Sequence, residues 1–172
     1  MPQLILLNGP PGCGKSTLAR MYADDHPLTL NLDIDHVAVL IGGWTANRHT
    51  AGQLARAIAL AAARTHLAAG HDVVIPQFLE ETDFIEQVEQ VARDAGAGFH
   101  EIVLTDGKEN AIQRYVKKPS DSTRQPVGTE ELAHMYDLLM SVITARPGTK
   151  LVPSIGGEEA AAYRALLDAL AP

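Results

Sequence analysis

The sequence predicts a three-layer α/β domain built on a mainly parallel sheet. Short apolar runs alternate with segments of helical spacing along the whole chain, and no internal repeat or long linker divides it. The length of 172 residues suits one domain with a sizeable buried core. We therefore expect a single domain over residues 1–172.

The first three elements are a strand, a helix and a second strand. QLILLNG, residues 3–9, is an apolar run that ends in a turn signal, which predicts a buried strand. KSTLARMYADD follows with helical spacing and places Leu18, Met21 and Tyr22 on one face. LTLNLD, residues 28–33, predicts the second strand.

The next three elements are a long helix, a strand and an amphipathic helix. Residues 50–69 predict the long helix, with Gly70 as a stop, because apolar and small residues recur there at helical spacing. The recurring residues of this helix are Leu54, Ala55, Ile58, Ala61, Ala62 and Thr65. HDVVIP, residues 71–76, predicts the third strand. EETDFIEQVEQVARDAG contains the amphipathic helix. The side chains expected to face the core are Phe84, Ile85, Val88, Val91 and Ala92.

The second half continues the alternation. FHEIVLTD, residues 99–106, predicts the fourth strand, and residues 108–118 predict a helix that Pro119 breaks. A further helix is expected at about 129–145, followed by a fifth strand at 149–154. EEAAAYRALLDAL closes the chain as a helix.

Composition narrows the class of protein. The formal net charge of −7 disfavours a nucleic-acid binder that works by neutralising the phosphate backbone. One cysteine cannot build a disulfide framework or a cysteine-ligated zinc site. We find no secretory signal and no apolar run that spans a membrane, so we expect a cytoplasmic protein without a membrane partner.

GPPGCGKS fits the pattern G-x-x-x-x-G-K-[ST], between a predicted strand and a predicted helix. Its glycines let successive N–H groups point at a polyphosphate, and the helix adds its positive end. Lys15 is expected to reach the β- and γ-phosphates, and the Ser16 hydroxyl to hold Mg²⁺. The strand–loop–helix context disfavours a turn without a ligand. The predicted nucleotide-binding residues are Gly9, Pro10, Pro11, Gly12, Cys13, Gly14, Lys15, Ser16 and Thr17.

Two aspartates follow the second predicted strand. The third strand ends VVIPQF without a carboxylate, so another acid must support the metal. Side chains two apart in an extended segment point the same way, so Asp33 and Asp35 can both face the carboxyl edge of the sheet. One acid would support Mg²⁺, and the other would orient or deprotonate an attacking hydroxyl. The alternative is a solvated Asp-rich loop.

A basic, Pro-containing stretch lies between two predicted helices, and we expect residues 114–128 to form a mobile lid. Arg114 and Arg124 are predicted catalytic residues that close over the transferring phosphate and stabilise its charge. An ordinary solvated surface is the alternative for both arginines. It is the preferred interpretation of Lys117 and Lys118.

Two segments offer candidate acceptor-binding residues. Trp44 stands four residues before Arg48, so its ring could form an apolar wall while the guanidinium clamps an anionic or polar group. Gln77 and Phe78 follow Pro76 at the carboxyl edge of the sheet. Packing for Trp44 and surface exposure for Arg48 are an equally open interpretation.

GPPGCGKST, LDIDHV and the basic stretch after LTDGKENAIQR resemble the small P-loop kinases of the nucleoside-monophosphate-kinase-like superfamily. Within it the chain is similar to the AAA-33 type, which includes chloramphenicol phosphotransferase-like, zeta-toxin-like, gluconate-kinase-like and shikimate-kinase-like proteins. The resemblance implies a five-stranded sheet in the order 2-3-1-4-5 and ATP as the donor. By analogy with the shikimate-kinase-like Asp-x-Asp, it implies that Asp33 lies near Mg²⁺ and that Asp35 faces the acceptor hydroxyl. PQFLEE replaces the glycine-rich acceptor motif of shikimate kinases, which argues against shikimate.

The sequence therefore predicts an ATP-dependent kinase, with Mg²⁺ as cofactor, that phosphorylates a hydroxyl of an antibiotic or another small metabolite. One alternative is a nucleotide-binding switch protein without an acceptor. Another is a kinase of nucleic-acid ends, which the acidic charge disfavours. The acceptor, the choice between ATP and GTP, and the oligomeric state stay open at this point.

Overall fold

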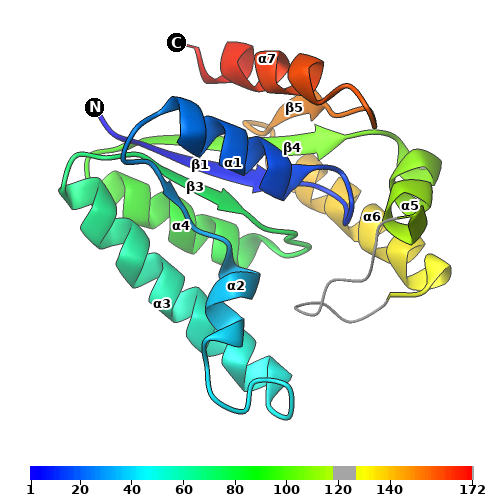
Figure 1. Ribbon diagram of the computed structural model, residues 1–172, viewed down its shortest axis with the longest axis horizontal. Helices are drawn as coiled ribbons and strands as arrows, with labels where there is room; N and C mark the ends of the chain where they lie inside the picture. The colour runs from blue at the N-terminus through cyan, green and yellow to red at the C-terminus, as the bar shows by residue number, and fades with distance from the viewer. Residues whose placement is uncertain (118–126, 172) are drawn as a thin grey trace.

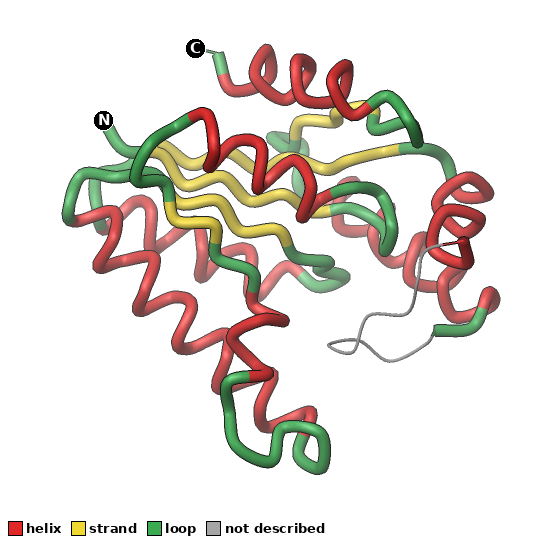
Figure 2. Tube along the Cα trace, viewed as in Figure 1, coloured by secondary structure: helices red, strands yellow, loops and turns green. Residues whose placement is uncertain are grey.

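A parallel β-sheet lies at the centre of the molecule. The computed structural model of the protein describes residues 1–117 and 127–171. Five strands lie in the order β2-β3-β1-β4-β5, and each neighbouring pair is parallel (Figures 1 and 2). The predicted α/β class and the strand order are confirmed. The strands are β1 (Gln3–Asn8), β2 (Leu30–Asn31), β3 (Val73–Pro76), β4 (Gly98–Thr105) and β5 (Lys150–Pro153).

Helices cover both faces of this sheet. In Figure 1, α1 and α7 lie on one face, and α3 and α4 lie on the other. Among the described residues, none of the helices combines the length and the hydropathy that a membrane span requires. The helices are α1 (Lys15–Asp25), α2 (Ile34–Val39), α3 (Arg48–Ala68), α4 (Thr82–Asp94), α5 (Lys108–Lys117), α6 (Thr129–Ala145) and α7 (Glu159–Leu170).

The central strand β1 contributes to both hydrophobic cores. Successive side chains of a strand point to opposite faces, so Leu4 and Leu6 pack with α3 and α4. Ile5 and Leu7 pack on the other face with α1 and α7. All four side chains are fully buried. The carboxyl end of β1 is therefore held between the two helical layers, where the glycine-rich loop begins.

The apolar spacing of α3 and α4, which cover the same face of the sheet, predicts the buried residues of α4 but not those of α3. All five residues expected to face inward from α4 are buried. Helix α3 forms as predicted, but Leu54 and Ile58 are about half exposed, at 49% and 48%. The buried stripe of α3 instead consists of four alanines and one leucine at every fourth position, and the alanines let the helix approach the sheet closely. These residues are Ala51, Ala55, Ala59, Ala63 and Leu67.

The segment after α1 differs from the predicted long strand. Leu28 has a left-handed φ of 70°, and β2 is only two residues long. Asp33 ends the extended stretch because it caps α2, with its side chain accepting the backbone N–H of Asp35 at 3.0 Å. The extended geometry predicted for the two aspartates is therefore wrong, since Asp35 lies in the first turn of a helix.

Candidate active site

The glycine-rich loop connects the central strand β1 to helix α1. Gly12 has φ 84°, and a Cβ there would lie 3.0 Å from the backbone nitrogen of Tyr115, so a side chain at this position would be strained and crowded. Gly14 precedes α1 with φ 94°, and no side chain caps this helix. A helix N-terminus that follows a loop of this kind favours an anionic ligand.

Lys15 is held inside this loop. Its ammonium nitrogen Nζ donates to the carbonyl oxygens of Gly9 at 2.8 Å and Pro10 at 2.9 Å. Only 7% of the residue is exposed. A buried ammonium needs such acceptors, and phosphate oxygens entering the loop would be stronger ones. The cation is thus already placed where a polyphosphate would bind.

A hydroxyl and a carboxylate lie side by side at the start of α1 and α2. Ser16 Oγ is 3.5 Å from Asp33 Oδ2, and His36 Nδ1 is 3.1 Å from the same oxygen. Oxygen ligands of this type fit Mg²⁺, which usually takes one or two from protein and the rest from phosphates and water. The described residues contain no cluster of three or more His, Cys, Asp or Glu that could hold a metal by itself. The two oxygens therefore fit a metal that is shared with a nucleotide.

Asp35 lies beside the carboxyl end of β3. Gln77 Nε2 donates to Asp35 Oδ1 at 3.4 Å, and the Gln77 backbone N–H donates to the carbonyl oxygen of Leu7 at 3.0 Å. These contacts connect α2 to the segment that follows β3. Asp33 and Asp35 thus both lie near the carboxyl edge, although a helix rather than an extended strand places them there.

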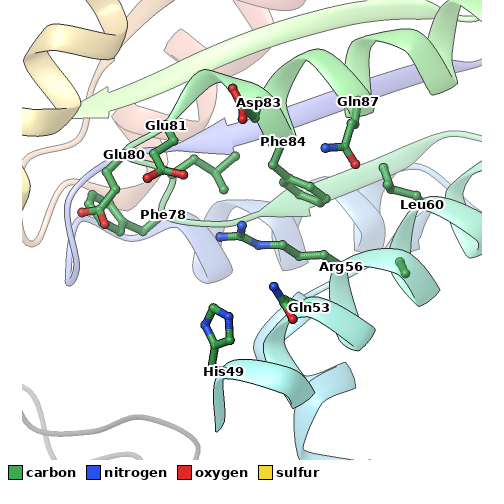
Figure 3. A pocket seen from close by; sticks show the side chains of 12 residues that line it. His49, Gln53, Arg56, Leu60, Phe78, Glu80, Glu81, Asp83, Phe84 and Gln87 are labelled. Carbon is green, nitrogen blue, oxygen red and sulfur yellow. The ribbon is translucent and has the colours of Figure 1, made fainter.

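A cavity of about 590 Å³ opens between α3 and the segment from β3 to α4 (Figure 3). This volume is in the range of small-molecule sites. The Arg56 guanidinium carbon lies 5.1 Å from the centre of the Phe84 ring, and Figure 3 shows the guanidinium inside the cavity. Aromatic, amide and charged groups share the lining. The lining residues are His49, Gln53, Arg56, Ala57, Leu60, Phe78, Leu79, Glu80, Glu81, Asp83, Phe84 and Gln87.

The predicted acceptor residues are only partly brought together. Phe78 lines the cavity. Trp44 and Arg48 contact each other instead, with the guanidinium carbon 4.8 Å from the centre of the ring, and neither lines the cavity. Sequence reasoning missed the lining face of α3. His49, Gln53 and Arg56 recur at spacings of four and three, which was the available signal.

Arg114, in the last turn of α5, lies next to Gly14 of the glycine-rich loop. Its Nη1 donates to Asp106 Oδ2 at 2.9 Å and to the carbonyl oxygen of Ser154. A Cβ on Gly156 would come within 3.3 Å of the Arg114 side chain, and one on Gly14 within 3.6 Å. A second cavity of about 240 Å³ opens here. It is lined by Asp106, Asn110, Gln113, Arg114, Lys117, Ile155 and Gly156.

The predicted lid is only partly within the structure. Arg114 and Lys117 lie in the last turn of α5. Lys118 and Arg124 lie outside the described residues. The expected closure of Arg114 and Arg124 over a transferring phosphate therefore stays a prediction.

Together, the parallel sheet and the glycine-rich loop after its central strand define a P-loop protein with a kinase-like fold. The chain belongs to the AAA_33 family, described as an AAA domain, whose family model matches residues 4–140. The resemblance of the sequence to AAA-33 type proteins is thereby confirmed.

Solved structures share this fold at low sequence identity. A gluconokinase from Sinorhizobium meliloti 1021 is 17% identical, with a TM-score of 0.65 over 98% of this chain and 92% of its own. The tunicamycin resistance protein of Deinococcus radiodurans is 14% identical, with a TM-score of 0.64 over 98% and 95% of the two chains. At these identities the similarity establishes the fold.

A local match in sequence covers less of the chain. A 40-residue segment is 48% identical to genome polyproteins of feline calicivirus, including strain F9. The segment spans 21% of this chain and 2% of the polyprotein, so it says nothing about the activity of the whole protein.

Proposed function

We propose that the protein is an ATP-dependent phosphotransferase that moves the γ-phosphate to a hydroxyl of a small molecule. The observation that carries this proposal is the position of Asp35. It lies two residues after Asp33, which contacts Ser16 of the P-loop, and it contacts Gln77, the residue before the cavity-lining Phe78. A donor loop, a carboxylate and an acceptor cavity are what phosphoryl transfer to an alcohol needs.

On the donor side, the P-loop amides and Lys15 would bind the triphosphate. Ser16 and Asp33 would hold Mg²⁺, which when bound neutralises charge on the β- and γ-phosphates. The smaller cavity would take the nucleobase, because the flat guanidinium of Arg114, which lines it, lies next to Gly14 of the P-loop. In this position, with its guanidinium bound to Asp106 and Ser154, Arg114 would contact the nucleobase, and reaching the transferring phosphate would require it to leave these two partners.

On the acceptor side, Asp35 would orient the attacking hydroxyl and accept its proton. The larger cavity combines the Phe78 and Phe84 rings with carboxylates, amides and Arg56. A lining of this kind suits a polar molecule with several hydrogen-bonding groups and one apolar side. Antibiotics and sugar derivatives both fit that description, and the names of the two similar structures support testing gluconate and tunicamycin.

An acceptor screen tests the proposal. The protein is incubated with ATP, Mg²⁺ and single candidates, and ADP release is followed against a reaction without acceptor. The panel contains an anionic, a neutral and a cationic sugar derivative (gluconate, glucose and glucosamine) and three antibiotics (tunicamycin, chloramphenicol and kanamycin). We expect at least one compound to raise ADP release and to yield a phosphorylated product by mass spectrometry.

Two variants assign the reaction to this site. Asp35→Asn should lower turnover by about a hundredfold or more while ATP binding is retained, because general base catalysis is worth that much. Asp24→Asn, which changes an exposed aspartate of α1, is the matched control and should leave turnover unchanged. Tight nucleotide binding without phosphorylation of any acceptor in a broad screen would favour the nucleotide-binding switch protein instead.

A further inference from the structure

Asn8, the last residue of β1, is a buried polar residue at the carboxyl end of the central strand. It is fully buried, with 0% of its surface exposed. A buried carboxamide is costly unless its donors and acceptor are paired, so its partners are informative. The amide nitrogen Nδ2 donates to the carbonyl oxygen of Leu79 at 3.0 Å. The oxygen Oδ1 accepts the backbone N–H groups of Leu79 at 2.9 Å and Gly9 at 2.7 Å.

These bonds join two parts of the site that are far apart in sequence. Gly9 is the first glycine of the P-loop and has φ 145°. Leu79 is 71 positions from Asn8 and lines the larger cavity, together with its neighbours Phe78 and Glu80. One side chain therefore binds the donor loop on one side and the wall of the cavity on the other.

The chemistry of this link requires an asparagine. The carboxamide offers a donor and an acceptor in one plane, which is what both backbone groups of Leu79 need. An aspartate would keep the acceptor and lose the donor, leaving the Leu79 carbonyl unpaired. An alanine would lose all three bonds.

We propose that Asn8 is a positioning residue that couples nucleotide binding in the P-loop to the wall of the acceptor cavity. When a nucleotide orders Gly9 and the loop behind it, the shared oxygen of Asn8 transmits that ordering to Leu79. The coupling itself requires only that the P-loop binds a nucleotide. Its consequence for catalysis rests on the proposed function, because it fixes the distance between donor and acceptor.

Hydrogen exchange at single amides tests the coupling without a known acceptor. Exchange of the Leu79 and Gly9 amides is measured by NMR with and without a saturating non-hydrolysable ATP analogue and Mg²⁺. We expect the analogue to slow exchange at Leu79 by about fivefold or more, the lower end of typical coupling between sites. Wild-type protein that binds the analogue without any change at Leu79 overturns the proposal, whatever the variants do.

Asn8→Ala separates positioning from a purely structural role. With the analogue again at saturation, we expect the slowing at Leu79 to be lost while the P-loop amides of residues 12–17 keep theirs. Equal slowing at Leu79 in Asn8→Ala and wild type overturns the proposal. Asn47→Ala, which removes an exposed bond from Nδ2 to the carbonyl oxygen of Gly43, is the matched control and should behave as wild type.

The outcome is independent of the acceptor screen. Coupling at Leu79 together with a failed screen would retain Asn8 as a link and remove the phosphotransferase proposal. Once an acceptor is known, Asn8→Ala should lower kcat more than it raises the KM for ATP, because donor and acceptor are misaligned while the P-loop still binds. If Asn8→Ala instead raised the KM for ATP and left kcat unchanged, a positioning role would be contradicted.

Discussion

The hydroxyl of Ser154 donates a hydrogen bond to the carbonyl oxygen of Cys13 at 2.6 Å, and both residues are buried. Ser154 directly follows β5, whereas Cys13 lies in the P-loop, 141 positions earlier. The same serine offers its own carbonyl oxygen to Arg114. The residue after β5 therefore contacts both the P-loop and Arg114, which lines the smaller cavity.

Replacing Ser154 by alanine should loosen the P-loop. The Cys13 carbonyl would lose its buried donor, which costs about 1–3 kcal/mol. We expect the free energy of unfolding in urea to fall by about that amount and nucleotide affinity to fall severalfold. Ser141→Ala is the control, since it removes an exposed bond to the carbonyl oxygen of Asp137 and should cost less than about 0.5 kcal/mol. Equal effects of the two changes would contradict this role.

Replacing Lys15 by methionine should abolish tight nucleotide binding. Methionine keeps much of the apolar stem but cannot donate to phosphate oxygens. We expect the Kd for a fluorescent ATP analogue to rise at least about tenfold, which corresponds to ~1.4 kcal/mol. Lys108→Met removes an exposed ion pair with Asp137 and should leave the Kd unchanged. An unchanged Kd in Lys15→Met would place the nucleotide elsewhere.

Asp33→Asn should separate metal support from helix capping. Asparagine is as good a helix cap as aspartate, so α2 and the free energy of unfolding should be retained. The lost charge beside Ser16 should raise the Mg²⁺ concentration needed for half-maximal ATP binding about tenfold. Asp35→Asn should leave that concentration unchanged, and the reverse pattern would exchange the roles assigned to the two aspartates.

His100 should make the protein less stable in mild acid. Burial and the nearby Lys150 hold the pKa of His100 below its ordinary value of about 6.5, and Asp72 opposes them. Between the lowered pKa and the ordinary one the unfolded chain binds more protons, so stability is lost as the pH falls below 6.5. We expect the free energy of unfolding to drop less between pH 7.5 and pH 5 in His100→Gln than in wild type. Urea unfolding at the two pH values measures this, and identical drops would show that His100 does not contribute.

The sequence was most informative where one local signal decided the structure. Helix α1 has the predicted bounds, and α4 buries the predicted residues, because its apolar face is large and regular. In α3 the alanines, rather than Leu54 and Ile58, face the sheet. Apolar spacing alone cannot distinguish these faces, since the choice depends on how closely the helix packs. The short helix α2 was missed because the capping role of Asp33 competes with the strand pattern before it.

In the candidate site, too, local motifs were predictable from the sequence and contacts between distant elements were not. The P-loop is a contiguous motif, so its residues were predictable together with their chemistry. The larger cavity is formed by α3 and the segment after β3. These two parts of the chain come together only in the tertiary structure, so no local pattern predicts the cavity. Phe78 was predicted from its position after a strand. The sequence did not predict that Arg56 and Phe84 line this cavity, because their contact joins two helices.

The two edges of the sheet have a consequence for how copies of this protein behave at high concentration. An exposed edge strand offers unpaired backbone groups to which another chain can add, which is a common route to aggregation. Here one edge strand, β2, is only two residues long. The other, β5, begins with Lys150 and ends with Pro153, which has no N–H to donate. Extension of the sheet from one molecule to the next is therefore disfavoured at both ends.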